Sequence, residues 1–247
     1  MNVFFLDTEF SNGNFYLGDI FEIALISERS GNVFHSFIKI PYPLDNYIKF
    51  MCNVTDDLLQ RDGSSFKKTF DDMINFINAD VEGTGGSPTT IIIAAHGGFS
   101  FDFPLLVTNC FKNKCNIGAM SDYQFIDTLQ ILQKEKGSKF YNIDTLSLKG
   151  LADKVLGNTT PTLHSAVADA TTLKKIYQHN PYKNILSENI TNTFTLESIH
   201  EHLTRKMPLT IEEVCKLSTS VSSAVRLTLL LYQHVQTKTA LKKKTGE

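Results

Sequence analysis

Four carboxylates and one histidine occur along the 247-residue chain, each beside a segment that we expect to be buried. In chain order they are Asp7, Glu9, Asp102, His164 and Asp169. Carboxylates that meet inside a core repel one another unless a cation lies among them. Their hard oxygen atoms suit Mg²⁺ or Mn²⁺, and a pair of such ions can clamp the attacking and leaving oxygens of a phosphodiester. The sequence therefore predicts a site for two divalent cations.

The first two carboxylates directly follow a short apolar run, Val3–Leu6, which has the pattern of a strand covered on both faces. Side chains two positions apart on an extended segment point the same way, so Asp7 and Glu9 can reach one ion. The alternative is an ordinary surface pair at a strand end. A charge at the tip of a buried strand favours the first interpretation, because it needs neutralising.

Asp102 stands at the expected start of a helix that has Pro104 in its first turn. An apolar strand ends before it, and two glycines, Gly97 and Gly98, allow a sharp turn between the two elements. Asp102 is thus a candidate ligand, with an N-cap aspartate as the alternative. The neighbouring Phe101 could stack on a nucleobase or belong to the core.

His164 and Asp169 form a His-x-Ala-x-x-Asp pattern. Five positions apart in a helix they would project about 140° from each other. Both can face one site only if His164 precedes a helix that begins near Ser165. The small residues Ala166 and Ala170 would let that helix approach the sheet closely.

The remaining periodicities predict an α/β fold, a sheet flanked by helices. The expected elements are a hairpin of Ile20–Ser27 and Val33–Ile40, strands over Thr89–Ala95 and the start of Tyr123–Leu132, and helices over Phe66–Ile77, Phe103–Phe111, Asn142–Leu156 and Ser165–Tyr177. After residue 180 the composition changes. A helical extension is expected there, with segments over Thr195–Arg205, Thr210–Leu217 and Val221–Val235 and a basic disordered tail at 241–247.

Composition limits the classes of function. The chain has 24 Lys and Arg against 26 Asp and Glu, a net charge of −2, so charge alone would not hold it to nucleic acid. The N-terminus lacks the pattern of a signal peptide, and no apolar stretch is long enough to span a bilayer. The four cysteines fit no common zinc template. We expect an intracellular protein, cytoplasmic or nuclear, with no membrane partner and with reduced thiols.

The motifs resemble those of the DEDDh (DnaQ-like) 3′–5′ exonucleases over about residues 1–180. The Asp-x-Glu motif corresponds to Asp7 and Glu9, the second motif ends at Asp102, and His-x-Ala-x-x-Asp corresponds to His164 and Asp169. The segment around Asp102, Ala-His-Gly-Gly-Phe-Ser-Phe-Asp-Phe-Pro-Leu-Leu, is most similar in sequence to the three-prime repair exonucleases. In that family an asparagine commonly follows the histidine of this segment, whereas this chain has Gly97.

The resemblance implies a ribonuclease H-like mixed sheet flanked by helices, with residues 1–180 as the nuclease domain. The helical extension expected over 181–240 lies outside the resemblance. The resemblance also implies two Mg²⁺ or Mn²⁺ ions held by Asp7, Glu9, Asp102 and Asp169, and His164 as the base that takes a proton from the attacking water. Products would be nucleoside 5′-monophosphates released from a 3′ end. We expect Phe10, Phe101 and the loop Asn53–Asp56 to pack on the terminal bases, because stacking accepts any base. Thr8, and Val54 of that loop, are further expected contacts to the substrate.

Two alternatives stay open. In the first, the same residues serve a 3′–5′ exoribonuclease, although the Asp-Phe-Pro-Leu-Leu sequence favours single-stranded or frayed DNA over RNA. In the second, the chain is a catalytically idle module that binds nucleic acid or protein. The intact set of five residues argues against this second alternative. The C-terminal helices could dock a second copy of the chain or a protein partner.

Overall fold

The computed structural model describes residues 1–12, 18–83, 90–135, 146–157, 164–179, 182–189 and 193–206. Their centre is a five-stranded sheet of order β3-β2-β1-β4-β5. The strands are β1 (Asn2–Phe10), β2 (Ile20–Ser27), β3 (Val33–Phe37), β4 (Ile91–Ala95) and β5 (Gln124–Asp127). β1, β2 and β3 pair antiparallel, whereas β4 runs parallel to both β1 and β5. The sheet is therefore mixed, as expected.

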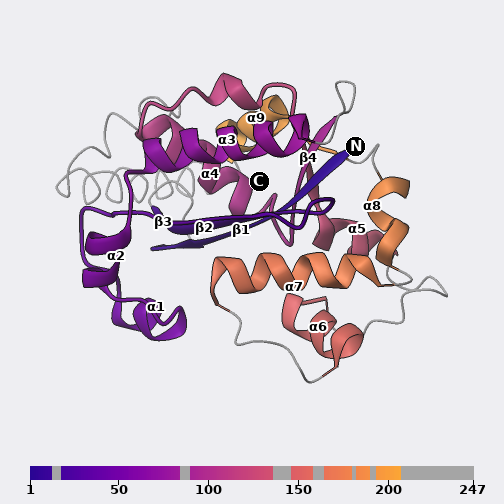
Figure 1. The fold of residues 1–247 in the computed structure, drawn as a ribbon, viewed down its shortest axis with the longest axis horizontal. Helices are drawn as coiled ribbons and strands as arrows, with labels where there is room; N and C mark the ends of the chain where they lie inside the picture. The colour runs from indigo at the N-terminus through magenta and orange to yellow at the C-terminus, as the bar shows by residue number, and fades with distance from the viewer. Residues whose placement is uncertain are drawn as a thin grey trace, which may run out of the picture.

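Helices cover both faces of the sheet, with α3, α4 and α9 on one side and α6 and α7 on the other (Figure 1). The described helices are α1 (Asn46–Met51), α2 (Asp56–Asp62), α3 (Phe66–Glu82), α4 (Asp102–Lys112), α5 (Thr128–Glu135), α6 (Leu148–Leu156), α7 (Ala166–Gln178), α8 (Ile185–Glu188) and α9 (Leu196–Lys206), with 3₁₀ turns at Ile117–Met120 and Tyr182–Asn184.

The central strand β1 divides the core in two because its side chains alternate between the faces. Phe4 and Leu6 lie in the cluster on the α3 and α4 side. Val3 and Phe5 lie in the cluster formed with α5, α6 and α7. Continuing the alternation, Asp7 and Glu9 must point to the α7 side.

The structure extends several predicted elements and adds helices α1, α2, α5 and α8, which the sequence analysis did not predict. β1 continues through Phe10, so Asp7 and Glu9 are inside the strand rather than after it. Helices α1 and α2 were not predicted, and they flank the loop that we expected at Asn53–Asp56, of which residues 53–55 lie between the two helices. Each is capped by a side chain, since Asp45 accepts a hydrogen bond from the Tyr47 main chain and Thr55 accepts one from Leu58.

The predicted helix at Thr195–Arg205 is present as α9, and it packs into the main core. Ile199 and Leu203 are fully buried in the same cluster as Phe4. Just before α9, Phe194 exchanges two main-chain hydrogen bonds of 2.8 Å with Phe125 of β5. The segments expected at Thr210–Leu217 and Val221–Val235, and the tail at 241–247, lie outside the described residues.

Two further expectations concern membranes and thiols. No helix within the described ranges has the length and apolar character that crossing a membrane requires. Cys52, Cys110 and Cys115 are free thiols. Cys215 lies outside the described residues.

Candidate active site

The acidic residues of β1 point to the α7 side near the carboxyl end of the strand. This is the edge where ligands bind in open α/β sheets. β1 pairs with the parallel strand β4 only from Asn2 to Phe5, so Asp7 and Glu9 lie just beyond the point where β4 leaves it. Across the strand's other edge, Glu9 lies directly opposite Glu22 of β2.

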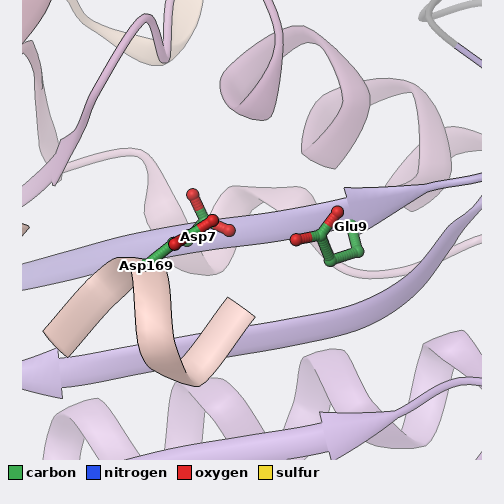
Figure 2. A group of neighbouring side chains, drawn as sticks. All are labelled: Asp7, Glu9 and Asp169. Atoms are coloured by element: carbon green, nitrogen blue, oxygen red, sulfur yellow. The ribbon is translucent and has the colours of Figure 1, made fainter. Parts of the chain in front are cut away.

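Helix α7 brings the third carboxylate to the same place. Ala166 and Ala170 are fully buried against Ala24 of β2, so small residues on both elements permit the close approach that we expected. Asp169 projects from the first turn of α7 toward β1 (Figure 2). Asp7, Glu9 and Asp169 each offer a carboxylate oxygen, and the three atoms lie within 4.8 Å of one another.

Asp102 is buried beside this group, at the first position of α4. Its Oδ1 accepts hydrogen bonds from the main-chain nitrogen of Thr8 at 3.0 Å and from the Thr8 hydroxyl at 2.7 Å. The N-cap position belongs to Phe101, and no side chain caps the helix there. Asp102 is therefore tied to β1 and does not act as a helix cap.

Burial is the main cause that raises the pKa of each of these carboxyl groups, and neighbouring negative charges add to the rise. Burial and the charges of Asp102 and Asp169 raise the pKa of Asp7 well above its usual value. For Glu9, burial raises the pKa to about 8 against an opposing hydrogen bond from Cys52.

Burial likewise raises the pKa of Asp102 to about 7, although the hydrogen bonds from Thr8 oppose the shift. It raises the pKa of Asp169 to about 6, opposed by the main-chain hydrogen bond from His164. A site with four such groups favours positive charge.

The donor set fits a hard divalent cation. The oxygens of Asp7, Glu9 and Asp169 converge, and Oδ1 of Asp169 is buried without a hydrogen-bond partner among the described residues. A buried carboxylate oxygen without a partner is costly, and coordination would satisfy it. Asp102 neighbours Asp7 closely enough to raise its pKa, but it is not part of the converging group.

His164 lies where the sequence required it, on the loop before α7. Its side chain is exposed, and its main-chain nitrogen donates to Oδ2 of Asp169 at 3.2 Å. Its φ of 79° is in the left-handed region, which residues other than glycine seldom adopt. This turn places His164 next to Asp169.

Glu22 was missed by the sequence analysis. It is 2% exposed on β2, and its charge contributes to the raised pKa values of Asp7, Glu9 and Asp169. Oε1 of Glu22 contacts Nε2 of His35 at 2.9 Å and accepts a hydrogen bond from the Ser165 hydroxyl at 3.2 Å. Glu22 thus links β2 to the start of α7. The available signal was a single charge inside the apolar run of β2.

Cys52 was also missed. Its Sγ donates to Oε2 of Glu9 at 3.4 Å, so the C-terminal end of α1 reaches the acidic group. Burial raises the pKa of the Cys52 thiol, and the neighbouring Glu9 adds to that rise.

The four expected substrate contacts have different surroundings. Phe10 and Phe101 lie nearly parallel, with ring centroids 6.1 Å apart and planes at 9°, and Phe101 is 46% exposed. Thr8 is buried and engaged by Asp102. Val54 is 3% exposed in a separate core cluster, so its side chain is not available to a ligand.

The loop that leads to Asp102 is held by a buried aspartate on β5. Oδ1 of Asp127 accepts from the main chain of Gly97 at 3.0 Å, and Oδ2 accepts from Phe99 at 3.0 Å. Gly97 has a φ of 78°, and Gly98 is packed so closely on Phe103 that a Cβ would lie 2.6 Å from its ring. These restraints fix the route from β4 to α4.

Sequence comparison finds no relative, since no family profile matches the chain and no curated protein matches it. Solved structures do resemble it. A 3′-exonuclease studied for 3′-end specific recognition of the histone mRNA stem-loop has a TM-score of 0.58 at 11% identity, over 75% of this chain and 64% of its own. The zinc-bound complex of E. coli ExoI with single-stranded DNA has a TM-score of 0.56 at 16% identity, over 77% of this chain and 43% of the ExoI chain.

The nuclease domain of 3′hExo, a DEDDh family member bound to rAMP, has a TM-score of 0.56 at 15% identity, over 71% of this chain and 88% of that domain. The chain thus spans less than two thirds of the first two proteins and most of the third. At these identities the likeness is one of fold. The expected ribonuclease H-like arrangement, a mixed sheet flanked by helices, is confirmed.

Proposed function

We propose that this chain is a divalent-metal-dependent 3′–5′ exonuclease of the DEDDh family, which releases nucleoside 5′-monophosphates from single-stranded or frayed ends. The observation that carries the proposal is the convergence of Asp7, Glu9 and Asp169 to within 4.8 Å, beside Asp102. The motifs that led to the family resemblance supply all of these residues. The fold likeness to DEDDh nuclease domains agrees with it.

Asp7, Glu9, Asp169 and Asp102 would hold two Mg²⁺ or Mn²⁺ ions. When bound, these ions supply charge stabilisation to a phosphoryl group under attack by water. Glu22 adds negative charge to the cation site without being one of the converging ligands. The hydrogen bonds from Thr8 fix the direction in which Asp102 presents its second oxygen.

His164 is the proposed general base. An exposed imidazole beside Asp169 can approach a water that attacks the terminal phosphodiester, and a ring nitrogen would accept its proton. The proton can then pass to solvent, because the side chain is not enclosed. The hydrogen bond from the His164 main chain to Asp169 keeps the base next to the cation site.

DNA is the favoured substrate, because the Asp-Phe-Pro-Leu-Leu sequence that begins at Asp102 is similar to that of the three-prime repair exonucleases. RNA is the second candidate, because the structures of similar fold include one that recognises an mRNA stem-loop as well as one bound to single-stranded DNA. Phe10 and Phe101 are the proposed contacts to the terminal base, and Thr8 supports the site through Asp102. Digestion of matched DNA and RNA single strands will decide between the two substrates.

The test of the proposal is a nuclease assay on 5′-labelled single strands with Mg²⁺ or Mn²⁺. The native protein should shorten strands from the 3′ end, chelation should stop it, and Asp7→Asn should reduce the rate at least a hundredfold. Asp72→Asn is the matched control, because Asp72 is an exposed aspartate on α3 that pairs with Lys68. A folded protein that binds Mn²⁺ yet releases no nucleotide from DNA or RNA would contradict the proposal and support the idle binding module.

A further inference from the structure

Three phenylalanine and tyrosine side chains are exposed in the part of the chain that the structure describes. They are Tyr47, Phe50 and Phe101, which are 68%, 82% and 46% exposed. Phe101 precedes Asp102, whereas Tyr47 and Phe50 belong to α1. Helix α1 lies near the end of the sheet where β1 ends and α7 begins (Figure 1). Exposed rings are thus present in two segments near the acidic group.

The two rings of α1 share one face of a helix that is firmly held. Residues three apart on a helix are neighbours on its surface, which places Tyr47 beside Phe50. On the inner side, Ile48 packs against a core cluster. Lys49 pairs with Asp56 at 2.5 Å, and Asp56 also accepts a hydrogen bond from the main chain of Leu44. The rings are therefore presented to solvent by an ordered support.

The distance from α1 to the acidic group is short. Cys52, the C-cap of α1, contacts Glu9 at 3.4 Å. Phe50 precedes Cys52 by two residues, so their Cα atoms are at most about 7.6 Å apart. Stacked nucleotides in one strand are spaced by about 3.4 Å. Residues two apart on a helix project about 160° from each other, so Phe50 is on the side of α1 away from Cys52 and Glu9. A strand whose 3′ end lies at Glu9 would therefore meet the rings of Phe50 and Tyr47 where it passes over the outer side of α1.

We propose that Tyr47 and Phe50 form a base-stacking surface for the nucleotides just upstream of the terminal one, separate from Phe10 and Phe101. This deepens the proposed function and rests on it. Neutral rings stack on any base, which suits an enzyme that must advance along every sequence.

The size of the surface favours bases over a protein. α1 has only six residues, whereas a stable protein interface buries about 800 Å² on each partner. The exposed apolar residues outside these two rings do not enlarge it. Val33 begins β3 and pairs with Ile26, at the end of the β2–β3 hairpin away from Glu22.

The direct test is the affinity of a dye-labelled ten-nucleotide single strand, measured by anisotropy in the inactive Asp7→Asn background. Phe50→Ser and Tyr47→Ser should each weaken binding at least fivefold, since loss of one base stack typically has this effect or a larger one. Val33→Ser is the matched control, an exposed apolar residue remote from the site, and should bind like the parent. Unchanged affinity in both α1 variants would overturn the inference.

A second measurement assigns the effect to bases. Strands that carry abasic residues at the second to fourth positions from the 3′ end should bind the parent at least fivefold more weakly. They should bind Phe50→Ser with little further loss. If the two changes reduce affinity independently, the ring does not contact those bases. If Phe50→Ser instead dissociates a dimer seen by sedimentation, the surface contacts a second copy of the chain and the inference fails.

A small substrate separates this inference from the proposed function. The p-nitrophenyl ester of thymidine 5′-monophosphate has no upstream bases, so Phe50→Ser should hydrolyse it at the native rate. A native protein that cleaves neither the ester nor any strand would remove both proposals. A native protein that cleaves strands, with α1 variants equal to it in affinity and rate, would remove only the stacking surface.

Discussion

Thr8 donates two hydrogen bonds to a single oxygen of Asp102, one from its main chain at 3.0 Å and one from its hydroxyl at 2.7 Å. The main-chain donor is available because pairing of β1 with β4 stops at Phe5. The two residues are 94 positions apart, so this contact fastens the start of α4 to the end of β1. Both hydrogen bonds go to Oδ1, so Oδ2 of Asp102 takes no part in the contact with Thr8.

Removing the hydroxyl should weaken both the fold and the site. Thr8→Val keeps the shape and deletes a hydrogen bond to a carboxylate, a contact worth about 1.5–3 kcal/mol. At pH 8 we expect denaturant unfolding to show a loss of that size. Activity should fall about 10- to 100-fold, as for other residues that orient a metal ligand. Thr8→Ser retains the donor and should stay near the native values; equal losses in both variants would contradict this account.

Stability of the metal-free protein should fall as pH rises. The folded-state pKa values of Glu9, Asp102 and Asp169 are raised to about 8, about 7 and about 6. The unfolded chain therefore loses these protons first, and the stability present near pH 4 is lost as pH rises to about 8. Carboxyl groups with a lowered pKa, such as Asp80, titrate below this range.

Thermal melting with a chelator between pH 5 and pH 8.5 measures this effect. The melting temperature should decline across the range, and Mn²⁺ should raise it most at the alkaline end, where the ligands are ionised. Asp7→Asn removes one of the repelling charges and should flatten the metal-free profile. A metal-free melting temperature that rises with pH would show that the carboxylates are stabilised by another partner.

The two glycines before α4 should respond differently to substitution. A Cβ at Gly98 would lie 2.6 Å from the ring of Phe103 and 2.7 Å from the Cβ of Ala95. Gly98→Ala should therefore cost about 1–3 kcal/mol through overpacking and displace the start of α4. Gly97 has a φ of 78° and its nearest neighbour would be Leu129 at 3.7 Å. Gly97→Asn should fold normally, because asparagine tolerates this conformation. Melting curves of both variants test the contrast.

Replacing His164 should affect the rate without affecting the fold. His164→Asn suits the φ of 79° and preserves the main-chain hydrogen bond to Asp169, but it lacks an imidazole. We expect kcat to fall about 10²- to 10⁴-fold, the usual contribution of a positioned base, with an unchanged melting temperature. His164→Ala should show the same loss of rate together with a small loss of stability. Native activity in His164→Asn would remove the histidine from the mechanism.

The sequence predicted those features that depend on local patterns. The bounds of β2 match the structure because Ile20–Ser27 is apolar and ends at a turn. The position of His164 before α7 followed from helical geometry alone, since only that placement allowed it to share a site with Asp169. The order of the acidic motifs along the chain indicated which elements had to meet.

The missed features depend on contacts between distant segments. The environment of Glu22 is set by His35, 13 positions away, and by Ser165, 143 positions away. Helix α1 is too short to show an apolar period, and it is held by the packing of Ile48 on a core cluster that includes Phe21 of β2, together with the ion pair of Lys49 and Asp56. Asn53, with a φ of 48°, redirects the chain there, and Val54, which we had expected at the substrate, lies in the core.

The burial of Ile199 and Leu203 against the first strand has a consequence for how the chain acquires its structure during synthesis. The layer above β1 is complete only after about two hundred residues have left the ribosome. Until then, a growing chain leaves apolar surface on one side of its sheet open to water and to other nascent chains. Pairing of β1 with β4 likewise joins segments some ninety residues apart, which slows the search for the native topology.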